Sequence, residues 1–92
     1  MERDVVITYE TLYEILRREK IRTELQPLSK DFLKDVVNYL SEKQSILDSQ
    51  MNKVSIFSSS ENHKTQKQIE NIKRMIKEIY ERRESKIVQM AL

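Results

Sequence analysis

The stretch IENIKRMIKEIYERRESKIVQM, residues 69–90, decides the fold class of this 92-residue chain. Its apolar residues recur at alternating steps of three and four, the period that places side chains on one face of an α-helix. The spacing predicts a helix over residues 64–92 whose apolar face is buried against other helices. Arg83 falls on this face, where it is expected either to extend outward to solvent or to pair with a carboxylate of a partner. The stripe consists of Ile69, Ile72, Ile76, Ile79, Arg83, Ile87 and Met90.

A shorter amphipathic helix is predicted near the start of the chain. Apolar residues at helical spacing from Tyr9 to Leu16, with Thr8 as N-cap, predict a helix over residues 9–20. A short strand over residues 5–9 is the alternative interpretation, but no clear hairpin turn lies nearby across which it could pair.

Between these two helices, a second long helix and two connectors are predicted. The only proline, Pro27, favours an extended connector, and Ser29 is positioned to cap a helix over residues 30–56. The serine-rich segment 57–63 is expected to form the second connector, because serine side chains compete with helical backbone hydrogen bonds.

Three helices in this order predict an all-α fold. We expect a single helical domain, residues 1–92, in which the short N-terminal helix packs across a long antiparallel helical hairpin. The chain ends on an apolar, uncapped run, so we expect a fragment of a longer chain or part of a larger helical bundle. That run contains Ile87, Val88, Met90, Ala91 and Leu92.

Composition argues against most catalytic chemistry. The chain has no Gly, which phosphate-cradling loops require, and no Cys for a thiolate metal site or nucleophile. Its single histidine, His63, cannot supply a pair of imidazole ligands, and no sequence context buries one carboxylate beside another. We therefore expect no enzyme activity, catalytic residue, metal or cofactor.

Charge and hydropathy indicate an intracellular protein with a modestly basic surface. The longest aliphatic run, Val5 to Ile7, is too short to span a membrane, and we expect a cytoplasmic protein. The net charge is +2, and residues 61–92 hold 8 basic and 5 acidic side chains. Arg82, Arg83 and Lys86 are a candidate basic patch, although a solvated helix face explains such a run equally simply.

Several runs of this sequence resemble the helical A domain of an archaeal GINS subunit, in the same order. The family has a short first helix, a Leu-Gln-Pro-Leu connector, a second helix that opens with Asp-Phe, and a basic run near the end of the third. The corresponding runs here are residues 12–20, residues 24–28, Asp31 with Phe32, and residues 81–88 followed by Ala91 and Leu92.

The resemblance implies a non-catalytic scaffold. GINS subunits assemble into a tetramer that bridges the MCM helicase and a RecJ-like or Cdc-type protein at the replication fork, so the chain would be nucleoid-associated and touch DNA weakly or indirectly. The small β-rich B domain of the family is absent from this sequence. By resemblance, partner or core contacts would come from Tyr9, Leu12, Leu16, Leu25, Pro27, Leu28, Phe32, Ile69, Ile72, Ile76, Ile79 and Ile87.

Two other functions remain open at this point. An internal core and a partner interface require the same apolar stripe, so the spacing alone does not identify a particular partner. A generic helical oligomerisation module is therefore the first alternative. A basic helical module that binds nucleic acid is the second.

Overall fold

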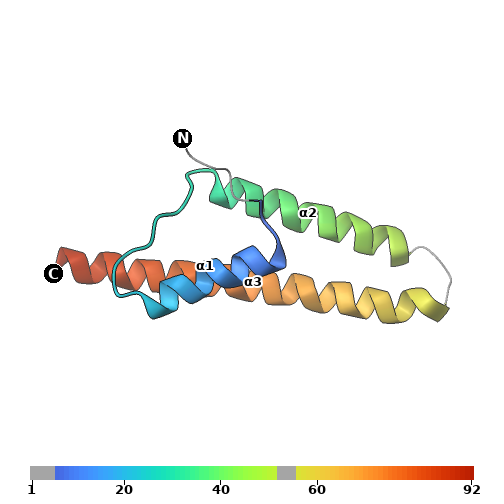
Figure 1. Cartoon of the computed structure of the whole chain (residues 1–92). Helices are drawn as coiled ribbons and strands as arrows, with labels where there is room; N and C mark the ends of the chain where they lie inside the picture. Colours follow the sequence, from blue (N-terminus) through green and yellow to red (C-terminus); the bar gives the residue numbers. More distant parts are fainter. Residues whose placement is uncertain (1–5, 52–55) are drawn as a thin grey trace.

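The computed structural model describes residues 6–51 and 56–92 and is built from three helices (Figure 1). They are α1 (Tyr9–Ile21), α2 (Phe32–Met51) and α3 (Ile56–Ala91), and the described residues contain no strand. The predicted all-α fold with a helical hairpin is therefore confirmed.

α1 begins where its capping residues place it. The Thr8 hydroxyl accepts a hydrogen bond from the Thr11 backbone N–H at 3.1 Å, and the Thr11 hydroxyl accepts one from the Thr8 N–H at 2.7 Å. These reciprocal bonds satisfy two backbone donors that the first turn of a helix leaves unpaired. The predicted start at Tyr9 is confirmed, and the strand interpretation is wrong for residues 6–9.

α2 begins two residues later than predicted. Ser29 Oγ accepts a hydrogen bond from the Asp31 N–H at 3.2 Å, and the Ser29 carbonyl accepts one from the Phe32 N–H at 3.1 Å. These bonds form a turn that leads into the helix. Residues 52–55, included in the predicted second helix, lie outside the described residues.

α3 corrects the prediction of a serine-rich connector. The helix already begins at Ile56, so residues 57–63 are helical rather than irregular. Serine in a helix costs only a fraction of a kcal/mol relative to alanine, and no Gly or Pro interrupts residues 56–91. Extending an existing helix is far easier than nucleating one, so the strongly helical stretch downstream continues through the serines.

α3 is the axis of the molecule. At about 1.5 Å per residue its 36 residues extend roughly 54 Å, in agreement with the longest dimension of 56 Å. α2 lies antiparallel to α3, whereas α1 lies beside α3 and runs in the same direction (Figure 1). Within the described residues, α1 and α2 each pack against α3 but have no close backbone contact with each other.

One apolar core joins the three helices around the middle of α3. Ile72 and Ile79 are completely buried. The ring centroids of Phe32 on α2 and Tyr80 on α3 lie 6.4 Å apart. The buried core side chains are Leu12 and Leu16 from α1, Phe32 and Val36 from α2, and Ile72, Met75 and Ile79 from α3. Within the described residues, no helix is both long and apolar enough to cross a membrane.

Candidate interaction surface and buried ion cluster

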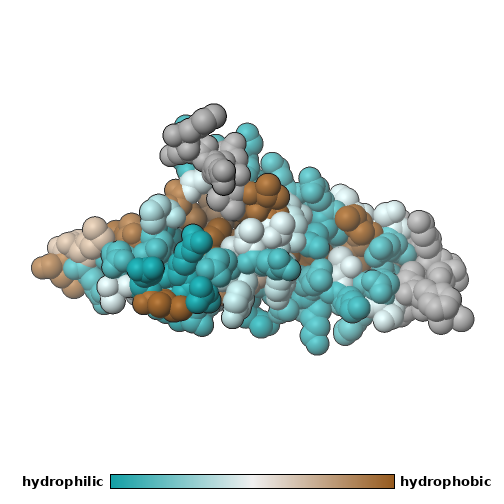
Figure 2. All heavy atoms as spheres, in the orientation of Figure 1, coloured by the Kyte–Doolittle hydropathy of each residue, from teal (hydrophilic) through white to brown (hydrophobic). Residues whose placement is uncertain are grey.

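The C-terminal end of α3 extends beyond the helices that cover its middle (Figure 1). Four large apolar side chains are exposed there, and Figure 2 shows hydrophobic side chains gathered at this end of the molecule. Large exposed apolar groups in one place are typical of surfaces that contact another macromolecule. These four residues, the α3 tip, are Ile87, Val88, Met90 and Leu92.

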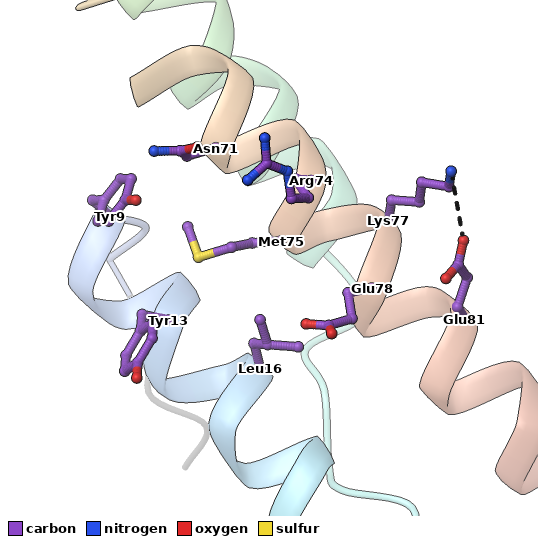
Figure 3. A pocket seen from close by; sticks show the side chains of 9 residues that line it. All are labelled: Tyr9, Tyr13, Leu16, Asn71, Arg74, Met75, Lys77, Glu78 and Glu81. Carbon is purple, nitrogen blue, oxygen red and sulfur yellow. Dashed lines mark ion pairs between the residues drawn. The ribbon is translucent and has the colours of Figure 1, made fainter. Parts of the chain in front are cut away.

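A hollow with a volume of about 520 Å³ lies between α1 and α3 (Figure 3). Tyr9 and Tyr13 project from α1 along one side of it, and Met75 faces them from α3. On the α3 side, Lys77 pairs with Glu81. This tyrosine groove is open and shallow, and its apolar floor belongs to the core described above.

The C-terminal end of α1 is joined to α3 by a buried ion cluster. Glu19 is 2% exposed, and its Oε1 accepts a hydrogen bond from Arg83 Nη1 at 2.7 Å. Lys86 Nζ donates to Glu19 Oε2. The two cations lie three residues apart on α3, which places them on one face of the helix. We refer to Glu19, Arg83 and Lys86 as the Glu19 cluster.

The cations of the Glu19 cluster also bind backbone carbonyls. Lys86 Nζ donates to the Glu19 carbonyl oxygen at 2.8 Å. This carbonyl lies in the last turn of α1, where the partial negative charge of the helix C-terminus attracts a cation. Lys86 Nζ donates further to the Glu24 carbonyl at 3.1 Å, and Arg83 Nη1 donates to the Gln26 carbonyl at 2.6 Å. In return, the Gln26 backbone N–H donates to Glu19 Oε1 at 3.3 Å.

The cluster keeps Glu19 ionised. Burial alone would raise the pKa of the Glu19 carboxyl, but the hydrogen bonds and positive charges of Lys86 and Arg83 outweigh burial and lower this pKa. Glu14, five residues earlier on α1, is a more exposed counterpart whose pKa is lowered mainly by its hydrogen bond to Arg17. Within the described part of the chain, no group of three or more His, Cys, Asp or Glu side chains is arranged to hold a metal ion.

The predicted contact residues divide into three groups. Leu12, Leu16, Phe32, Ile69, Ile72 and Ile79 are buried, whereas Pro27 and Ile87 are exposed. The half-buried remainder is Tyr9, Leu25, Leu28 and Ile76, and all of these except Leu25 pack against the core. The structure thus assigns most of this set to an internal core and leaves Pro27 and Ile87 on the surface.

The candidate basic patch is largely engaged within the chain. Arg83 and Lys86 bind Glu19, and Arg82 forms an ion pair with Glu78 at 3.6 Å. Arg83 therefore pairs with a carboxylate, as one interpretation of its seam position predicts, but the carboxylate belongs to its own chain. Sequence reasoning did not single out Glu19, which looks like one of several charged residues at the end of α1.

Comparisons with protein-family models, with curated proteins and with solved structures find no match to this chain.

Proposed function

We propose that this chain is a non-catalytic scaffold subunit of the GINS type that assembles with other helical subunits. In this role it bridges the MCM helicase and a RecJ-like or Cdc-type protein at the replication fork, in the cytoplasm at the nucleoid. Three of the runs that resemble the family support the proposal because they meet in space. Glu19 lies in the first run, Glu24 and Gln26 in the connector, and Arg83 and Lys86 in the last run.

The observation that carries the proposal is the exposure of the α3 tip. Ile87 is 52% exposed and Met90 is 74% exposed, although the same face of α3 is buried further back at Ile72 and Ile79. Val88, on the neighbouring face, is also 52% exposed. Apolar surface removed from water contributes about 25 cal/mol per Å², so covering these side chains favours association. An apolar stripe on a partner helix is the chemistry that fits this surface.

Light scattering on mixtures tests the proposal. The chain is measured alone and after mixing with a GINS subunit of the complementary type from the same organism. We expect a discrete mixed species of higher mass. No mixed species under conditions where both proteins are folded would contradict the GINS assignment.

Two matched variants locate the contact. Ile87→Lys introduces a charge at the α3 tip, and Ile46→Lys introduces the same charge at an equally exposed isoleucine on α2, because both are 52% exposed. We expect Ile87→Lys to abolish the mixed species and Ile46→Lys to leave it intact. Equal effects of the two variants would exclude the α3 tip as the contact.

The same exposed surface also supports the generic oligomerisation module as a second candidate. In that case the chain self-associates, ignores the GINS-type subunit, and loses self-association on Ile87→Lys. Nucleic-acid binding has less support, because Arg83 and Lys86 are already paired with Glu19.

A further inference from the structure

α1 is attached to the rest of the molecule through α3 alone. Within the described residues it has no close backbone contact with α2. Residues 22–31, which follow α1, form neither helix nor strand, so no regular set of backbone hydrogen bonds ties α1 to α2. A helix of 13 residues is marginal in water by itself, so α1 keeps its helical hydrogen bonds because it is docked on α3.

Three buried side chains anchor α1 on α3. They are Leu12, Leu16 and Glu19, and their steps of four and three residues place them on one face of the helix. The two leucines belong to the apolar core. Glu19 is the one buried charged residue among those that the structure describes, and its carboxylate binds Arg83 and Lys86. One of the three anchors is therefore ionic and depends on a single carboxylate.

The same ionic anchor also holds the first half of the connector. The Gln26 backbone N–H donates to the Glu19 carboxylate. The Glu24 and Gln26 carbonyls accept hydrogen bonds from Lys86 and Arg83. The end of α1 and residues 22–26 thus bind to one set of side chains, and loss of the Glu19 cluster releases both.

The α2–α3 hairpin has contacts of its own. Leu47 on α2 and Ile69 on α3 are each 5% exposed, but neither belongs to the core cluster that contains the α1 leucines. Lys43 Nζ on α2 donates to Gln68 Oε1 on α3 at 3.2 Å. These contacts involve no α1 residue, so they persist when α1 leaves α3.

We propose that α1 and residues 22–26 form a latch that opens from α3 as one unit while the α2–α3 hairpin stays folded, and that the Glu19 cluster keeps this latch closed. Opening uncovers the apolar surface of α3 around Met75, which faces α1 in the closed chain (Figure 3). Units that open at a lower free energy than the whole fold are the elements from which gated surfaces are built. The latch does not depend on the proposed function, because no partner takes part in it.

Native-state hydrogen exchange on the 92-residue chain tests the latch. We expect the Leu16 and Gln26 amides to exchange through one common opening, about tenfold faster or more than the Ile69 amide after correction for intrinsic rates. Low concentrations of urea should accelerate Leu16 less steeply than Ile69, because opening the latch exposes less surface than global unfolding. Equal protection of Leu16 and Ile69 would overturn the proposal.

A variant in the hairpin tests whether the two units are independent. Leu47→Ala removes contacts that are present whether the latch is closed or open. We therefore expect it to accelerate exchange of the Ile69 amide about tenfold or more and to leave the Leu16 amide unchanged. Leu47→Val is a milder truncation that makes the same comparison if Leu47→Ala does not fold. Equal acceleration at Leu16 and Ile69 would mean a single cooperative unit and would overturn the proposal.

A matched pair of α1 variants tests the Glu19 cluster. Because Glu19 stabilises only the closed latch, we expect Glu19→Gln to accelerate exchange at both Leu16 and Ile69 by the same factor, about tenfold or more. Glu14→Gln removes an exposed carboxylate from the same helix and should leave both amides unchanged. If Glu19→Gln opens the latch fully, Leu16 exchanges as an unstructured peptide does while Ile69 stays protected, which supports the proposal. No acceleration in Glu19→Gln, or an equal effect of Glu14→Gln, would overturn the role of the cluster.

Discussion

The middle of α3 and its C-terminal third meet α1 by different physical means. In the middle of α3, Ile72 and Ile79 share one apolar core with Leu12 and Leu16 of α1. Such apolar contacts are non-directional. Four residues after Ile79, the contact becomes ionic, and Arg83 and Lys86 converge on Glu19. The apolar region can supply most of the stability, since burial energy scales with area, whereas the ionic region fixes the positions of particular atoms. We therefore expect the two regions to respond differently to substitution, to pH and to salt.

The largest expected effect is in the apolar region. Ile72→Ala removes three carbons from a completely buried side chain, and we expect a loss of about 4 kcal/mol in the free energy of unfolding. Ile76 is only half-buried, so Ile76→Ala is the matched control with a smaller expected loss of about 2 kcal/mol. Urea denaturation followed by circular dichroism measures both. Equal losses in the free energy of unfolding would show that the difference in burial between Ile72 and Ile76 does not determine the cost of truncating them.

A somewhat smaller effect is expected in the ionic region. Glu19→Gln keeps the side-chain volume but leaves Arg83 and Lys86, which are 17% and 13% exposed, without their anion. Removing one member of a buried ion pair costs about 3 kcal/mol or more, and the partial exposure of the cations favours the lower value. The same denaturation experiment measures it. A loss below that of Ile76→Ala would contradict the view that this carboxylate is essential to the contact.

The pH dependence distinguishes the two regions directly. Because the pKa of Glu19 is lower in the folded chain than its ordinary value of 4.5, ionised Glu19 favours the folded state above that pH. This contribution is lost as the pH falls through the folded-state pKa. We therefore expect the difference in melting temperature between wild type and Glu19→Gln to be largest near neutral pH and to disappear in acid. A difference that stays constant from pH 7 to pH 3 would contradict an ionic contribution, and Ile72→Ala should show no such convergence.

Sequence reasoning succeeded in one region and failed in the other for a physical reason. The apolar stripe of α3 follows from local spacing, so Ile69, Ile72 and Ile79 could be identified as buried without knowing their partners. The partners of Glu19 lie 64 and 67 residues away, and no local pattern distinguishes it from Glu14 or Glu10. The one available signal was Arg83, a charge on an apolar seam, which indicates that a carboxylate is near but not which one. The serine-rich start of α3 was misassigned because helix continuation outweighs the weak local preference of serine.

The smallest expected effect comes from Glu14, which matches Glu19 in residue type, helix and cationic neighbours. Glu14 pairs with Arg17 at 3.0 Å and Arg18 at 3.6 Å, but the three side chains are 41%, 52% and 63% exposed. Water and salt screen such a surface pair, and both members stay solvated when it is broken. We therefore expect Glu14→Gln to leave the melting temperature at pH 7 unchanged within error, and high salt to have no further effect on the variant. A destabilisation comparable to that of Glu19→Gln would mean that charge rather than burial governs the α1 carboxylates, and the contrast between a directional buried cluster and a screened surface pair would fail.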